Sequence, residues 1–191
     1  MTHILSDAAP GAASPSCAPG FAGRASALLA AARGLVPSLE AGRPIDSAAL
    51  RAAMVGALDG TDAEGAWDWK SAYDACEAAE ILFLRRYGQT ITGRAPGNAL
   101  ALIERVAALL PTHTRRSETS QALQQYSTPP GLAYVASIAA ALVPGDHVLE
   151  PSAGTGMMAV HALLARASLT LNELAETRAE LLGSLFPGIA V

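Results

Sequence analysis

The chain has 191 residues, of which 51% are hydrophobic; this excludes a disordered protein and supplies a core for one domain or two small ones. Its formal net charge is −4 at pH 7, which excludes a global basic field that would attract nucleic acid. A DNA contact would therefore need a local patch or another part of a larger protein.

The cysteines and histidines indicate an intracellular protein without a metal centre. Cys17 and Cys76 lie far apart without a paired spacing, which is typical of reduced thiols. No basic segment followed by an apolar core opens the chain, and no apolar stretch reaches the about 18 residues of a membrane span. We therefore expect a cytoplasmic protein with no signal peptide and no membrane contact. The histidines are scattered, so each is expected at the surface or in packing rather than as a ligand: His3, His113, His147 and His161.

The first part of the chain predicts a mobile tail and then a small all-α helical unit. Residues 1–22 are rich in Ala, Pro, Gly and Ser without periodicity, so they cannot bury enough surface to offset the entropy of ordering. Apolar spacing in residues 23–112 predicts four helices. Asp46 is the expected N-cap of the second, which should stop at Asp59 and Gly60. The expected helix ranges are 24–35, 46–58, 67–87 and 98–110.

The third of these helices is the longest. Thr61 with Glu64 has the capping-box pattern that announces it, and Gly88 is expected to end it; Asn98 should cap the fourth helix. An aromatic stripe along the third helix could stack on bases. Core packing is the favoured interpretation, because four charged residues fall elsewhere on the helix and make it amphipathic: Glu77, Glu80, Arg85 and Arg86. The unit offers no catalytic constellation.

Residues 111–117 form the expected joint to the rest of the chain. Its pair Arg115 and Arg116 could meet a phosphate backbone, but two charges are too few for a patch, so a solvated linker is favoured. A helix over 117–125 should follow. Thr128 is then placed as N-cap and Pro129 as first residue of a helix over 129–142. Its expected buried side carries Leu132, Val135, Ala139 and Leu142.

A strand, a glycine loop and a helix follow in residues 147–164. The apolar pair before Glu150 predicts a strand, and Gly154 and Gly156 allow a sharp turn and close approach of a ligand to the loop backbone. A second strand over 168–173 ends at Glu173, roughly 20 residues after Glu150, where nucleotide-binding βαβ units carry the acid that binds ribose hydroxyls. We expect a crossover helix over 174–185, a turn at 186–188 and a third strand over 189–191.

Three motifs in order carry a resemblance to a known family. The string Glu-Pro-Ser-Ala-Gly-Thr-Gly at 150–156 resembles the first motif of S-adenosylmethionine-dependent methyltransferases, and its Glu-Pro-Ser form resembles the adenine-N6 DNA methyltransferases. The segment Gln-Tyr-Ser-Thr-Pro-Pro at 125–130 resembles their upstream Thr-Pro motif. Residues 124–191, including Leu-Asn-Glu-Leu at 171–174, look like the amino-terminal methyltransferase part of bacterial methylase/helicase proteins of the strawberry-notch type. The resemblance covers about the last third of the chain and does not extend residue by residue to the helical unit.

The resemblance implies an α/β fold, an incomplete Rossmann-like class I methyltransferase with three parallel strands, and S-adenosyl-L-methionine as cofactor. It places Glu150 near the methionine amino group, Glu173 on the ribose hydroxyls and Leu174 on the adenine ring. The two loop glycines would approach the sugar and the methionine portion, while Thr128 and Tyr126 would close over the methionine end. The implied cofactor-binding set is Tyr126, Thr128, Glu150, Ser152, Gly154, Gly156, Glu173 and Leu174.

The catalytic motif of the resembled enzymes, an Asp or Asn followed by Pro-Pro and an aromatic residue, does not occur in this sequence. We therefore assign no catalytic residue and expect residues 113–191 to be the amino-terminal half of a methyltransferase domain, with DNA bound through a longer protein that includes a helicase. One alternative is a non-catalytic helical interaction module with a remnant nucleotide-binding fold. A nicotinamide dehydrogenase fragment is a weaker alternative, because the Glu-Pro-Ser and Thr-Pro-Pro strings do not suit it.

Overall fold

The computed structural model describes residues 21–112 and 126–191. The expectations for residues 1–20, for the arginine pair of the joint and for a helix over 117–125 lie outside these residues. Residues 21 and 22, expected in the tail, belong to the first helix. The elements in chain order are α1 (Phe21–Glu40), α2 (Ser47–Leu58), α3 (Trp69–Thr92), α4 (Pro96–Ala107), α6 (Pro130–Ala139), β1 (His147–Glu150), α7 (Met157–Leu164), β2 (Ser168–Leu171) and α8 (Glu176–Leu185).

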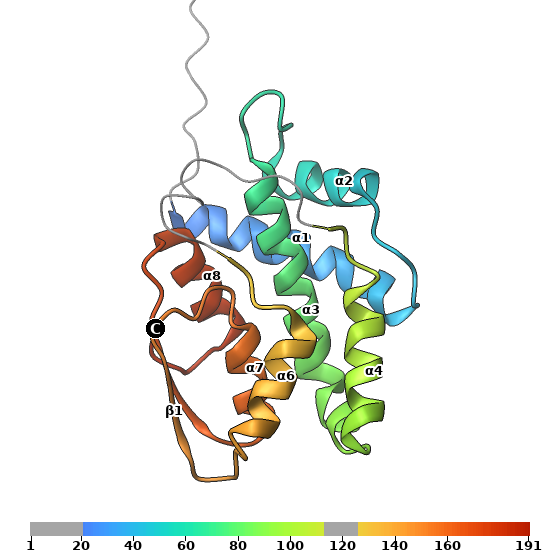
Figure 1. Ribbon diagram of the computed structural model, residues 1–191. Helices are drawn as coiled ribbons and strands as arrows, with labels where there is room; N and C mark the ends of the chain where they lie inside the picture. Colours follow the sequence, from blue (N-terminus) through green and yellow to red (C-terminus); the bar gives the residue numbers. More distant parts are fainter. Residues whose placement is uncertain (1–20, 113–125) are drawn as a thin grey trace, which may run out of the picture.

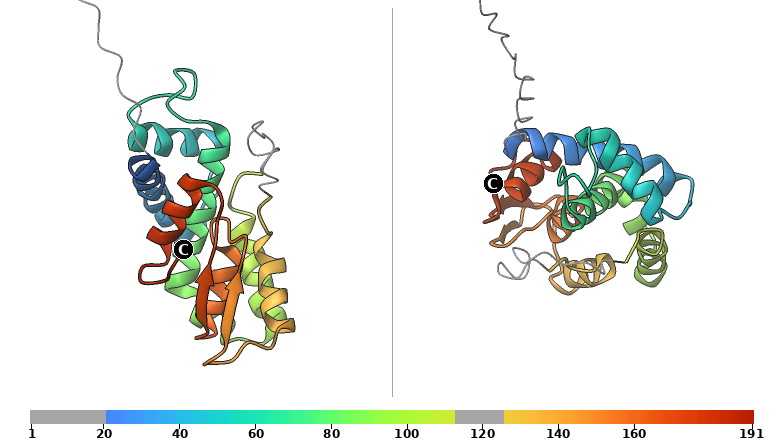
Figure 2. Two further views of the ribbon diagram at one scale, coloured as in Figure 1. Left: turned by 90° about the vertical axis from the view of Figure 1, so that its left-hand side faces the viewer. Right: turned by 90° about the horizontal axis from the view of Figure 1, so that it is seen from above.

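The fold is mixed α/β, mostly helical, and α3 runs through its middle. Figure 1 shows α3 between α4 on one side and α7 and α8 on the other, with α1 crossing it. The views in Figure 2 show the strands at one flank, away from α2. One hydrophobic core joins α1 at the start of the chain to Phe186 just after α8, so the helices and the βαβ segment share their buried surface.

The sheet of the described residues has two parallel strands, β1 and β2, with His147 opposite Ser168 and Glu150 opposite Leu171. Helix α7 connects them and packs on them. The expected third strand over 189–191 is not formed. These residues meet the far edge of β2 through one backbone hydrogen bond, from Leu171 N to Ala190 O at 3.3 Å, and one such bond does not make a ladder.

Residues 72–81 of helix α3 are all buried, which corrects the expectation that this part of the helix is amphipathic. Its expected stripe does enter the core through Tyr73 and Cys76, and Arg85 and Arg86 are exposed. However, Glu77 and Glu80, expected in solvent, are only 6% and 2% exposed. The physical reason is that α1, α4, α7 and α8 all pack around α3, so the Glu77 and Glu80 side chains have little access to water.

The helix starts follow local side-chain chemistry with two corrections. Asp46 caps α2 as expected, with its carboxylate accepting from Ala49 N at 2.8 Å. Thr61 and Glu64 do form a reciprocal capping box, with bonds of 2.8 and 3.2 Å, but it closes a separate turn. Asp68 caps α3 instead, accepting from Ser71 N at 2.8 Å. Helix α4 begins at Pro96, before Asn98, because proline is suited to the first turn.

Gly88 does not end α3, which continues to Thr92. It is buried, and a Cβ at this position would collide with the Leu164 side chain at the end of α7. Because the absent side chain lets the two helices approach closely, Gly88 is a packing residue within the helix and not its stop.

Helix α6 buries the opposite face from the one expected. Its first residue is Pro130, one later than expected, and Pro129 takes the N-cap position. The buried residues are Gly131, Ala133 and Tyr134, whereas Leu132 is 62% exposed. A Cβ on Gly131 would collide with the Glu104 side chain, so small residues are what allow α6 to lie close to α4. The remaining expected core residues of α6, Val135 and Ala139, are also exposed, and Leu142 is half-buried.

Candidate functional site

The glycine loop connects the end of β1 to the start of α7. Gly154 and Gly156 both have positive φ, 60° and 103°, a conformation that L side chains rarely adopt. The loop is tied to the end of β2, since Ala153 N donates to Asn172 O at 2.8 Å and the Asn172 side chain donates to Pro151 O at 2.9 Å. The loop is therefore held in a fixed shape at the carboxyl ends of both strands.

A hollow of about 50 Å³ lies against this loop. The structure brings together there five of the eight residues predicted to bind a cofactor: Tyr126, Thr128, Glu150, Ser152 and Gly154. The rest of the lining comes from Ser127, from the loop itself, from the start of α7 and from two charged residues of other helices, Glu77 and Arg178. The hollow is thus built from the segment before α6, the glycine loop, α3 and α8.

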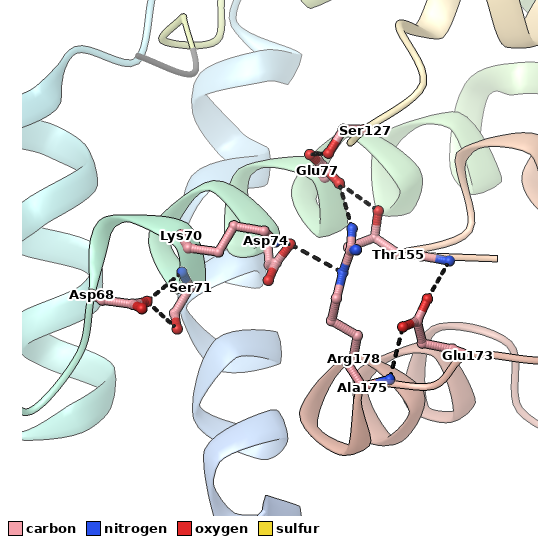
Figure 3. Close-up of polar contacts among 11 residues, drawn as sticks. Asp68, Lys70, Ser71, Asp74, Glu77, Ser127, Thr155, Glu173, Ala175 and Arg178 are labelled. Carbon is pink, nitrogen blue, oxygen red and sulfur yellow. Dashed lines mark hydrogen bonds and ion pairs between the residues drawn. The ribbon is translucent and has the colours of Figure 1, made fainter. Parts of the chain in front are cut away.

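Three predicted residues lie outside the lining. Gly156 lies against the buried ring of Phe186, and a Cβ at this position would overlap that ring. The Glu173 carboxylate accepts from Gly154 N at 2.8 Å and from Ala175 N at 2.9 Å, so it joins the glycine loop to the start of α8 (Figure 3). Leu174 is 79% exposed. Gly156 therefore serves the packing of α8, whereas Glu173 lies at the edge of the loop.

A buried network of charges supports the floor of the hollow. Glu77 on α3 accepts a hydrogen bond from the Thr155 hydroxyl at 2.6 Å and another from the Ser127 hydroxyl. Arg178 of α8 lies between Glu77 and Asp74, with its Nη2 3.8 Å from the Glu77 carboxylate and its Nε 3.4 Å from that of Asp74 (Figure 3). A Cβ on Gly154 would lie 3.2 Å from the Arg178 guanidinium, so the loop rests directly on this side chain.

Asp74 is the most deeply buried acid of this network. Burial raises the pKa of Asp74 to about 6, and the charges of Lys70 and Arg178 oppose that shift. Lys70, one turn before it, donates a hydrogen bond to its carboxylate. Two cations therefore compensate Asp74 and Glu77, which keeps both acids paired inside the fold.

The sequence did carry a signal for this network. Asp74, Glu77 and Glu80 recur every three residues in a stretch otherwise composed of Ala, Cys and Ile from 75 to 81. Acids on one face of so apolar a run are expected to need buried partners. Nothing in the sequence indicated that Arg178, about a hundred residues later, would be that partner.

Comparisons of the chain with protein-family models, with curated proteins and with solved structures found no match. The arrangement of side chains is therefore the basis for a function. The hollow offers the Glu150 carboxylate and hydroxyl groups, which together suit a small polar ligand that carries an N–H donor. Within residues 21–112 and 126–191, no group of three or more metal-ligating side chains is present. In the same residues, no helix has the length and apolar character needed to cross a bilayer.

Proposed function

We propose that this chain binds S-adenosyl-L-methionine at the glycine loop and is the cofactor-binding portion of a methyltransferase, with adenine N6 of DNA as the acceptor in a longer methylase/helicase protein. The observation that supports this proposal most is the shared hollow of Tyr126, Thr128, Glu150, Ser152 and Gly154. These residues come from two sequence motifs, and they meet at the carboxyl end of β1, where ligands of open α/β sheets bind.

The residues present fit the cofactor in two parts. The hollow of about 50 Å³ has room for the ammonium group of the amino-acid end, where the Glu150 carboxylate would accept a hydrogen bond from it. The nucleoside would lie outside it, along Glu173 and Leu174. Each carboxylate oxygen of Glu173 accepts one hydrogen bond and has a second lone pair for a ribose hydroxyl. The exposed side chain of Leu174 offers an apolar surface to the adenine ring.

The bound cofactor would supply an electrophilic methyl group on a positively charged sulfur. The contribution of this chain would be orientation. The hydrogen bond from Thr155 to Glu77 and the closeness of Gly154 to Arg178 hold the loop so that Glu150 beside it keeps its position. We assign no proton transfer to any residue of the chain.

Calorimetric titration with S-adenosylhomocysteine tests the proposal. The wild-type chain should bind it, and Glu150→Gln should weaken binding by about tenfold or more, because a charge-assisted hydrogen bond to the ammonium group is lost. Glu180→Gln, an exposed change on α8, is the matched control and should leave the affinity unchanged. Absence of binding by the wild type, with NAD as a parallel probe, would contradict the proposal.

A non-catalytic helical interaction module is the second candidate function. The small volume of the hollow favours it, because about 50 Å³ holds one or two water molecules and no nucleoside. This candidate predicts that the chain does not bind S-adenosylhomocysteine, so the same titration distinguishes the two functions.

A further inference from the structure

A second, larger cleft adjoins the hollow. It has a volume of about 340 Å³ and lies between α3, the end of α4 and the segment that leads into α6. Leu110, Pro129, Pro130 and Met157 give it apolar walls, and Glu77 and Glu80 contribute carboxyl groups. Its size is in the range of small-molecule sites, of roughly 300–1,000 Å³, and apolar walls with a few polar groups are typical of them.

Glu80 is the unusual residue of this cleft. It is 2% exposed, and its Oε1 has no hydrogen-bond partner among the described residues. Desolvation, together with the negative charges of Glu77 and Glu104, raises the pKa of Glu80 to about 8. Glu77, by contrast, accepts from Thr155 and lies close to Arg178. The cleft therefore contains a buried acid, Glu80, with two other acids near it and with one carboxylate oxygen that lacks a hydrogen-bond donor among the described residues.

We propose that this cleft binds a small protonated amine with an apolar body, and that the ammonium group donates to the Glu80 carboxylate. A buried carboxylate without a counter-charge is costly, and a cation removes that cost. The apolar walls favour an aliphatic or aromatic body over an inorganic ion. The described residues also offer no group of three or more metal-ligating side chains here. This inference goes beyond methyl transfer and stands without the proposed function.

Charge and the number of hydrogen-bond donors explain why an alcohol would bind less tightly than the amine. An ammonium group brings a positive charge and up to three N–H donors, so it can satisfy Glu80 and reach a second acceptor in the lining. A neutral hydroxyl brings one donor and no charge, so it cannot offset the cost of ionising the buried Glu80. Discrimination between an amine and its alcohol isostere is therefore the signature of this site.

Calorimetric titration of the whole chain at neutral pH with 2-phenylethylamine, and with 2-phenylethanol as its neutral isostere, tests the proposal. The amine should bind at least about tenfold more tightly than the alcohol. Glu80→Gln keeps the size of the side chain and should reduce amine affinity by about tenfold or more, while alcohol binding changes little. The exposed change Glu180→Gln should leave both affinities as in the wild type.

Three outcomes would overturn the proposal. These are no amine binding by the wild type, equal binding of amine and alcohol, and equal amine affinity in the wild type and in Glu80→Gln. Displacement of the amine by calcium chloride, beyond that produced by sodium chloride at equal ionic strength, would assign the cleft to an inorganic cation instead. A parallel titration with S-adenosylhomocysteine reports on the glycine-loop hollow, so failure at one site is distinguished from failure at the other.

Discussion

The Thr155 hydroxyl donates a 2.6 Å hydrogen bond to the Glu77 carboxylate, across 78 residues of sequence. Thr155 is in the glycine loop and Glu77 is in the middle of α3, and both are buried. The loop that would receive a ligand is thus anchored to the longest helix of the amino-terminal part. Positions in that helix are therefore expected to influence ligand binding.

Thr155→Val should remove this anchor at almost constant volume. Loss of the buried hydrogen bond should lower the free energy of unfolding by about 1–3 kcal/mol, because Glu77 loses one donor. Urea denaturation measures this change. Thr170→Val, an exposed position on β2, is the matched control and should change stability by less than about 0.5 kcal/mol. Equal effects of the two changes would contradict a stabilising role for the Thr155 hydrogen bond.

Arg178→Met should be among the most destabilising changes on α8. It leaves Asp74 and Glu77 buried without the guanidinium between them, so the free energy of unfolding should fall by about 3–5 kcal/mol. The control is Arg51→Met, which breaks an exposed ion pair with Asp62 and should cost no more than about 1 kcal/mol. A stability loss at Arg178 as small as that at Arg51 would show that the buried network is not needed for folding.

A comparison of Gly156→Ala with Gly145→Ala separates two contributions to the loss of stability, overlap with Phe186 and backbone strain. Gly156 and Gly145 have similar positive φ values, 103° and 98°, but a Cβ meets Phe186 at the first and open space at the second. Gly145→Ala should therefore report strain alone, about 1–2 kcal/mol. Gly156→Ala should cost about 1–3 kcal/mol more, because the buried ring must move. Thermal or urea unfolding of both variants gives the comparison, and equal losses would remove the role assigned to Phe186.

We expect the buried His161 to lower the free energy of unfolding in acid. It is buried on α7, and this burial lowers the pKa of His161 from 6.5 to about 4, opposed in part by the backbone of Pro130. Between these values the unfolded chain binds a proton that the folded chain does not, so stability falls as pH falls. His161→Leu should remove on the order of 2–3 kcal/mol of this loss. Urea denaturation of both proteins at about pH 7 and about pH 4.5 measures it.

Asp74 and Glu80 have raised pKa values and act in the opposite direction, so the difference between the wild type and His161→Leu is the quantity to compare. A constant difference across this pH range would contradict a buried neutral imidazole.

The effect of Glu80 on stability should have the opposite pH dependence to that of His161, and Glu80→Gln tests it. Because the pKa of Glu80 is raised from 4.5 to about 8, the folded chain holds an extra proton between these values, so stability falls as pH rises across this range and the loss is complete above about 8. The amide cannot ionise, so the variant should gain stability relative to the wild type, on the order of 3 kcal/mol at alkaline pH. Unfolding at about pH 5 and about pH 9 measures the change, and Glu180→Gln should show none.

The sequence was most informative where local chemistry decides the structure. The order of β1, the glycine loop, α7, β2 and α8 follows directly from apolar runs and positive-φ glycines, and the carboxylate of Asp46 determined the start of α2. The capping box at Thr61 also formed. It did not start α3, because Asp68, seven residues later, offers the backbone a competing cap.

What the sequence could not give depends on contacts between distant segments. Helical periodicity cannot identify the buried face of α6 when small residues face the neighbouring helices and Leu132 faces outward. The same limit applies to Glu77 and Glu80, because their burial depends on how four other helices surround α3. For the candidate site, the motifs predicted five residues of the lining, and the charged floor of Glu77 and Arg178 became visible only in the fold.

The central position of α3 has a practical consequence for protein engineering. Grafting residues 126–191 onto a foreign helical scaffold would transplant Arg178 without Asp74 and Glu77, and Gly88 would no longer receive Leu164. A working chimera would have to carry these two acids and the glycine at matching helical positions. Boundaries for chimeras are therefore better chosen by these complementary pairs than by the change from helices to strands along the sequence.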